Sequence, residues 1–141
     1  MRKYLTHSIE QDVKFSEVDS LGVVWHGHYP QYFEDGREAF GKQYNLGYLD
    51  FYSNGFVVPI VNIQCDYKLF LRYGDRITIE TTYVANLAAK INFEYRILKA
   101  NTQELVVTGS SVQVFLNADG LGLQLNNPEF FQNWKEKYGM A

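Results

Sequence analysis

Asp19 and His26 are the residues whose types and spacing could carry out acyl-group chemistry. Asp19 stands in a predicted turn, and His26 follows seven residues later, shortly before a helix signal at Pro30. A carboxylate can attack a carbonyl carbon or activate water, and free N–H groups at the start of a helix can hold the oxyanion. The alternative for Asp19 is a structural turn or capping residue. The spacing alone leaves both interpretations of Asp19 open, and hydrolysis of an acyl bond is the chemistry that the segment could support.

His26 offers two groups to such a reaction. Its backbone N–H could donate to an oxyanion whatever its side chain does. Its imidazole, with an unperturbed pKa of about 6.5, could orient Asp19 or a water, or could simply bond a loop carbonyl. His26 and His28 are separated by one residue, and only His7 remains elsewhere, which makes a poor zinc site. We expect no metal.

The helix that follows this segment is predicted over residues 30–44. Apolar residues recur there at helical spacing, and proline suits the first turn. Gly36 lies on the apolar stripe, where its missing side chain would let a sheet approach closely. Arg37 lies three residues after Glu34, which favours a structural ion pair.

Most of the remaining chain is predicted to form strands. Alternation of apolar and polar residues, or a long apolar run, indicates strands over residues 4–15, 56–71, 76–85, 90–99 and 104–117. Pro59 should occupy an edge or bulge position. Residues 45–55 are expected to form a loop. Asn127 as N-cap and Pro128 at the first position predict a terminal helix over 128–139.

This order of elements predicts an α+β fold in one domain spanning residues 1–141. An antiparallel five-stranded sheet would wrap around the single long helix, because the helix must bury its apolar stripe. Such a sheet has two edges that must be paired or protected, and edge-to-edge dimerisation would pair one of them.

Composition excludes several classes of protein. The net charge of −3 gives no electrostatic case for nucleic acid. No apolar run approaches ~20 residues, so no membrane span is expected, and the N-terminus has no apolar region typical of a signal peptide. The single cysteine, Cys65, rules out an internal disulfide, and its apolar strand predicts an inert core residue. A cytoplasmic location is the simplest expectation.

Two blocks of residues resemble the signature of a known family. The first block consists of Asp19, Gly22, Val23, Val24, His26, Tyr29, Phe33, Glu34 and Arg37. The second consists of Pro59, Asp66, Tyr67, Arg72, Tyr73, Gly74 and Asp75. Their order and spacing resemble the hotdog-fold 4-hydroxybenzoyl-CoA thioesterase family, which includes the Tol-Pal-associated acyl-CoA thioesterases. The resemblance extends from about residue 6 to residue 115. It implies a hotdog fold that hydrolyses an acyl-CoA thioester to a free acid and coenzyme A, with no cofactor besides the coenzyme A of the substrate.

By position, the resemblance implies that Asp19 is the catalytic carboxylate and that the His26 N–H is the oxyanion donor. The residues that it places at the substrate are Gly22, Val24, Trp25, Pro59 and Lys90, with Pro59 across the active site and Lys90 at the coenzyme A phosphates. The chain has Glu17 where many members carry an aspartate. Lys68, Arg72 and Arg76 form a second basic cluster that could contact the phosphates.

The resemblance and the strand order together imply a homodimer or homotetramer with active sites at subunit interfaces. Two other functions remain open. An acyl-ACP thioesterase would explain why only Lys90 falls at the family's phosphate-binding position. A non-catalytic acyl-thioester-binding module is the second alternative, against which an intact Asp19 argues. The acyl group, and the choice between a nucleophile and a general base for Asp19, are not decided by the sequence.

Overall fold

The computed structural model describes residues 3–141. Five strands form the main sheet: β1 (Tyr4–Asp12), β3 (Ile60–Tyr67), β4 (Arg76–Val84), β5 (Lys90–Lys99) and β6 (Leu105–Val114). The remaining elements are the 3-10 turns η1 (Phe15–Glu17) and η2 (His26–His28), the helices α1 (Tyr29–Tyr44), α2 (Tyr48–Ser53) and α3 (Glu129–Lys137), and the short strands β2 (Phe56–Val57) and β7 (Leu116–Asn117).

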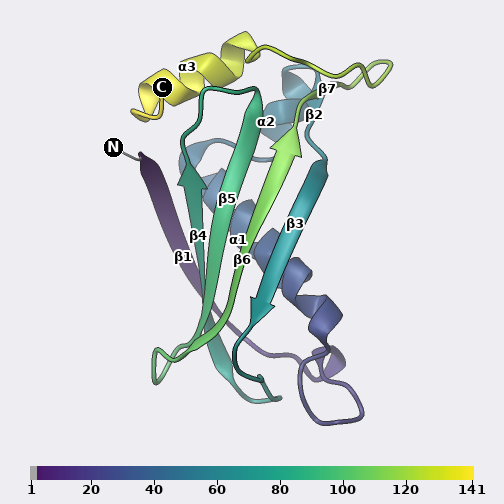
Figure 1. The fold of residues 1–141 in the computed structure, drawn as a ribbon, viewed down its shortest axis with the longest axis vertical. Coiled ribbons are helices and arrows are strands. Elements are labelled where there is room, and N and C mark those ends of the chain that lie inside the picture. Colours follow the sequence, from purple (N-terminus) through teal and green to yellow (C-terminus); the bar gives the residue numbers. More distant parts are fainter. Residues whose placement is uncertain (1–2) are drawn as a thin grey trace.

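The main sheet is antiparallel, with the strand order β1-β4-β5-β6-β3, and α1 lies along one of its faces (Figure 1). Strands β2 and β7 pair with each other beside one end of the sheet. The predicted α+β arrangement, an antiparallel five-stranded sheet with one long helix, is confirmed. Strand β3 forms one edge of the sheet and β1 the other.

Helix α1 buries an aromatic face against the sheet. Tyr32, Phe33 and Phe40 are fully buried, and the Phe33 ring stacks on that of Tyr95 with centroids 4.3 Å apart. The helix ends at Asn45, which adopts the left-handed conformation (φ 58°) common for asparagine at this position. The predicted helical stripe is thus the stripe that packs on the sheet.

Gly36 allows the close approach that the sequence predicts. A Cβ built on Gly36 would collide with Thr81 Oγ1 and would lie 2.9 Å from Ile79 Cγ2, both on β4. These two side chains are fully buried, so neither can move into solvent. The glycine therefore sets the distance between α1 and the sheet.

We expect Gly36→Ala to lower the free energy of unfolding by about 1–3 kcal/mol, because the new methyl group overpacks the contact with β4. Helix propensity alone would act in the opposite direction, by about 1 kcal/mol. Urea unfolding followed by circular dichroism measures the difference. Gln43→Ala, at an exposed position of the same helix, is the control and should change stability by less than about 0.5 kcal/mol. A Gly36→Ala protein as stable as the wild type would contradict the close approach.

The apolar segment 56–71 is divided and does not form the one predicted strand. Its first residues form β2, which pairs with β7, and Pro59 separates β2 from β3 because it has no N–H for a ladder. Pro59 thus lies just before the edge strand β3 and not at the predicted edge or bulge position within a strand; the register of β3 against β6 shifts later, between Ile60 and Asn62. The predicted strand 104–117 is divided in the same way into β6 and β7.

Two further predictions are wrong in detail. Strand β1 ends at Asp12, so Phe15 does not share the buried face of Val13; it lies in η1 with 73% of its surface exposed. The predicted loop 45–55 contains α2, whose start is capped by a 2.7 Å hydrogen bond from the Gly47 N–H to Asp50 Oδ2.

Helix α3 packs across the end of the sheet opposite the loop before α1 (Figure 1). It lies within the predicted range 128–139, but Asn127 is not its N-cap. Asn127 Oδ1 instead accepts from the buried Lys135 Nζ at 3.2 Å. Lys135 also donates to the carbonyls of Asn86 (2.9 Å) and Ala88 (3.3 Å), which fastens α3 to the β4–β5 loop.

Candidate active site

Asp19 begins a tight turn in the loop between η1 and η2. Its N–H donates to Val23 O (2.9 Å), and the Gly22 N–H donates to Asp19 O (3.0 Å). Gly22 has φ +80°, a left-handed backbone conformation that glycine adopts more readily than other residues. The carboxylate atom Oδ1 accepts from the Leu21 N–H at 2.9 Å. The predicted turn is therefore present, and the half-buried carboxylate is oriented by its own backbone.

The turn is fixed to the body of the protein at Val24 and Trp25. The buried Val24 donates its N–H to Leu71 O (2.8 Å), and Trp25 donates its N–H to Glu17 O (3.0 Å). The Glu17 side chain is buried and accepts from the Lys14 N–H (2.7 Å) and from the Tyr32 hydroxyl (3.0 Å). Burial, and then the Glu17 carboxylate, raise the pKa of Tyr32, so its hydroxyl remains a donor.

Glu17 is a structural residue of the site that sequence reasoning treated only as a departure from the family. Its bond to Tyr32 ties the loop to α1, and its backbone carbonyl holds Trp25. A signal was available, since a carboxylate three residues after Lys14 can cap a short turn, and the Lys14 N–H bond does this.

His26 begins η2, which leads directly into α1. Its N–H has no acceptor among residues 3–141, as expected at the start of a helical segment. Its carbonyl accepts from the Tyr67 hydroxyl at 3.0 Å. The imidazole is exposed and contacts the Trp25 ring, with centroids 5.2 Å apart. The free N–H is the feature that an oxyanion donor requires.

Trp25 covers the start of η2. Its ring is half exposed and also contacts that of His28, with centroids 5.4 Å apart. A Cβ at Gly27 would collide with the Trp25 ring, so the glycine makes room for the indole. The structure thus brings together five of the predicted site residues, namely Asp19, Gly22, Val24, Trp25 and His26.

Pro59 and Lys90 lie at the other end of the sheet in the same chain. Both neighbour Val114: its N–H donates to Pro59 O at 3.2 Å, and Lys90 is its partner in the β5–β6 register. Tyr67, which contacts His26, stands eight residues after Pro59 on β3, and at about 3.3 Å per residue this separation is roughly 25 Å. One chain therefore does not assemble all the predicted substrate contacts.

A groove runs along the side of the first turns of α1, next to the edge strand β3. Its lining residues are Pro30, Gln31, Glu34, Asp35, Arg37, Glu38, Ile60 and Ile63. Arg37 donates to the buried Tyr95 hydroxyl at 3.0 Å, rather than forming the predicted pair with Glu34. On the same strand, Cys65 packs against the core from the edge and is half-buried, and burial raises the pKa of its thiol.

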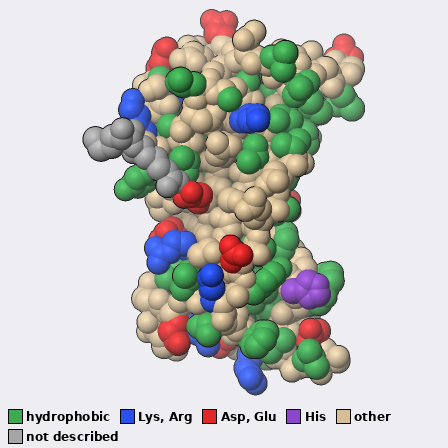
Figure 2. All heavy atoms as spheres, in the orientation of Figure 1, with side chains coloured by type: hydrophobic (Ala, Val, Ile, Leu, Met, Phe, Trp, Pro, Cys, Tyr) green, Lys and Arg blue, Asp and Glu red, His purple; other side chains and the backbone are tan. Residues whose placement is uncertain are grey.

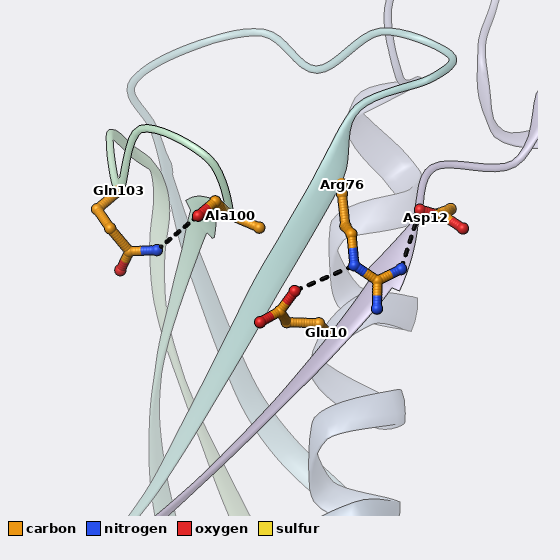
Figure 3. Close-up of polar contacts among 5 residues, drawn as sticks. All are labelled: Glu10, Asp12, Arg76, Ala100 and Gln103. Atoms are coloured by element: carbon orange, nitrogen blue, oxygen red, sulfur yellow. Dashed lines mark hydrogen bonds and ion pairs between the residues drawn. The ribbon is translucent and has the colours of Figure 1, made fainter.

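The basic cluster near the site is smaller than the sequence indicates. Arg76 Nε donates to Glu10 Oε1 (3.0 Å) and Arg76 Nη1 to Asp12 Oδ1 (3.1 Å), which joins β4 to β1 (Figure 3). The same view shows Gln103 bonded to the Ala100 carbonyl in the β5–β6 hairpin. Arg76 is thus engaged in a structural contact.

The face of the sheet turned away from α1 is polar. Figure 2 shows this face, on which charged side chains of both signs lie among polar groups. A shallow hollow there is lined mainly by polar residues, including Gln64, Asp66, Thr82, Thr108 and Ser110. The groove beside α1 is also mainly polar, but it adds three apolar residues, Pro30, Ile60 and Ile63.

Residues 3–141 contain neither a metal-binding cluster nor a membrane-spanning helix. No three His, Cys, Asp or Glu side chains in this range lie close enough together to hold a metal ion. None of the helices in this range is long and apolar enough to cross a membrane.

Residues 13–134 match the family model of the thioesterase-like superfamily, and the chain belongs to this family. "Putative acyl-CoA thioesterase YneP" of Bacillus subtilis is 26% identical over 132 residues, 94% of each chain. The chloroplastic acyl-acyl carrier protein thioesterase ATL3 of Arabidopsis thaliana is 26% identical over 111 residues, which are 79% of this chain and 58% of ATL3.

The solved structure of the DHNA-CoA thioesterase from Staphylococcus aureus has the same fold. Its TM-score is 0.85 at 23% identity, over 95% of this chain and 89% of the other. The predicted hotdog fold and the predicted thioesterase family are therefore confirmed.

Proposed function

We propose that this protein is an acyl-CoA thioesterase that hydrolyses its substrate to a free acid and coenzyme A through Asp19. The observation that carries the proposal is the pairing, in one short loop, of an oriented carboxylate with the free N–H of His26. The name of YneP supports the same substrate class.

In this mechanism the carbonyl oxygen of the thioester accepts from the His26 N–H, which stabilises the oxyanion as it forms. Asp19 either attacks the carbonyl carbon, giving an anhydride that water then hydrolyses, or removes a proton from a water that attacks. In both routes the C–S bond breaks and the thiolate of coenzyme A leaves. A thiolate leaves readily, so one carboxylate and one oxyanion site suffice.

We further propose that two copies of the chain complete each site. Strand β3 is an edge strand that exposes Val61 (58%), Ile63 (41%) and Tyr67 (50%). Antiparallel pairing of two such edges would bring the Pro59 and Lys90 end of one copy to the Asp19 loop of the other. A homodimer, or a homotetramer built from it, follows, and sedimentation equilibrium tests it: a monomer at micromolar concentration would contradict this arrangement.

The direct test of the activity is thiol release from a panel of aromatic and medium-chain acyl-CoAs. The protein has one thiol of its own, Cys65, so release of many equivalents per chain is required as proof of turnover. No turnover of any member would contradict the proposal. Tight binding without turnover would favour the non-catalytic module.

An acyl-ACP thioesterase is the second candidate, and similarity to ATL3 favours it. Arg76 is engaged with Glu10 and Asp12, which leaves fewer cations for coenzyme A phosphates. Comparing kcat/KM for the same acyl group on coenzyme A and on acyl carrier protein separates the two. A cytoplasmic location, cofactor-free hydrolysis and the absence of nucleic-acid partners stay predictions.

A further inference from the structure

Tyr67 joins the edge strand β3 to the site loop. It is the last residue of β3, and its hydroxyl donates to His26 O at 3.0 Å, across 41 residues of sequence. Its ring contacts the buried Tyr29 edge to face, with centroids 5.3 Å apart. Tyr29 is the first residue of α1, so the packing of the ring fixes where the hydroxyl can reach.

The carbonyl that Tyr67 holds belongs to the peptide between His26 and Gly27. In a trans peptide the C=O and the N–H point in opposite directions, so holding the carbonyl also fixes the direction of the Gly27 N–H. Glycine leaves the backbone free to rotate, because it has no Cβ. A rotated peptide would turn a carbonyl oxygen, instead of an N–H, toward a developing oxyanion.

The Tyr67 hydroxyl reaches this peptide from a different element of the fold. Among residues 3–141, the N–H groups of His26 and Gly27 have no acceptor, and Tyr67 is the side-chain donor to the His26 carbonyl. The Trp25 ring lies over Gly27, but this contact is apolar. The Tyr67 hydroxyl is therefore the polar side-chain group that restrains the orientation of this peptide from outside the helical turn.

We propose that Tyr67 is a positioning residue for the hydrolysis: it holds the His26–Gly27 peptide so that N–H groups, and no carbonyl, face the thioester oxygen. This inference rests on the proposed function.

The state of the Tyr67 hydroxyl suits this role. Burial, followed by a hydrogen bond with the Cys65 thiol, raises the pKa of Tyr67 above its ordinary value of about 10. The hydroxyl is thus protonated and able to donate throughout the neutral range, so its effect should not vary between pH 6 and 9.

The test is Tyr67→Phe, which removes the hydroxyl and keeps the ring on Tyr29. We expect kcat for the best acyl-CoA to fall five- to tenfold, roughly the effect of one hydrogen bond, while KM changes less than about twofold. The matched control is Tyr73→Phe, an exposed tyrosine at the same end of the molecule whose ring contacts Phe15 and whose hydroxyl has no partner among residues 3–141. It should leave both constants unchanged.

A second measurement does not depend on turnover. The amide nitrogen of Gly27 should shift upfield in the NMR spectrum of Tyr67→Phe, because its peptide loses the bond to the carbonyl, and should not move in Tyr73→Phe. An unmoved Gly27 signal, or a moved signal with unchanged kcat, overturns the positioning role while Asp19-dependent turnover by the wild type leaves the proposed function intact. Absence of turnover in the wild type itself overturns the proposed function, and the positioning role with it.

Discussion

Asp19→Asn should lower kcat on acyl-CoA by a factor of about 10²–10⁴, which is the usual contribution of a positioned general base. Asparagine keeps an oxygen that can accept from the Leu21 N–H, so the turn that begins at residue 19 should persist. The substitution then removes the negative charge and little else. Steady-state thiol release measures the effect, and KM should change much less than kcat.

Asp75→Asn is a close control for this variant. The Asp75 carboxylate also accepts from a backbone N–H of its own turn, that of Arg72 at 2.8 Å, although Asp75 ends its turn and Asp19 begins one. It has no part in the proposed chemistry, so its variant should keep full activity. Equal activity in Asp19→Asn and Asp75→Asn would show that Asp19 is only a turn residue.

Raising the pH above about 10 should destabilise the protein through its buried tyrosines. Burial raises the pKa of Tyr29 to about 12, and it also raises the pKa values of Tyr32 and Tyr83. In the unfolded chain these hydroxyls ionise near pH 10, so above that pH the folded state holds more protons. The contribution of these three hydroxyls to the free energy of unfolding is complete below pH 10 and is lost as the pH rises above 10. Three such groups lower the free energy of unfolding by roughly 4 kcal/mol between pH 8 and pH 11.

Tyr83→Phe isolates one of these groups. The Tyr83 hydroxyl is buried without a hydrogen-bond partner among residues 3–141, so its removal breaks no such bond there. At pH 8 the variant should be at least as stable as the wild type. Above pH 10 its stability should fall less steeply, by about 1.4 kcal/mol per pH unit. Urea unfolding at several pH values measures both, and parallel curves for the two proteins would contradict the assignment.

The spacing of apolar residues predicts the bounds of a helix or strand where that element buries one face and exposes the other. Strands β4 and β5 and helix α1 each bury one face, so alternation or helical spacing predicted them within one residue. The segment 56–71 carries apolar residues along its whole length, at exposed as well as partly buried positions, so apolarity does not indicate where a strand ends. Helix α2 has six residues, too few for a periodic pattern to emerge.

The features of the candidate site likewise fall into those that the sequence predicts and those that depend on packing between separate elements. Asp19 and His26 lie seven residues apart in one short segment, so the sequence alone could identify them as candidates for one site. The bonds from Tyr32 to Glu17 and from Tyr67 to His26 join separate elements and depend on the packing of α1 and β3. The distance of Pro59 from this loop reflects the length of β3, and contact between them would need a second chain, which no pattern within one sequence reports.

The surroundings of the two tryptophans give the protein two distinct fluorophores. Trp25 is half exposed beside His26, while Trp134, a residue of α3, is 6% exposed, and its indole N–H donates to Tyr44 O at 2.7 Å. Emission from a buried indole lies at shorter wavelength than emission from one in contact with water. The long-wavelength part of the tryptophan emission spectrum therefore reports on the site loop, and the short-wavelength part reports on α3 at the opposite end of the sheet. A conformational change in the loop can thus be distinguished by intrinsic fluorescence from loosening of α3.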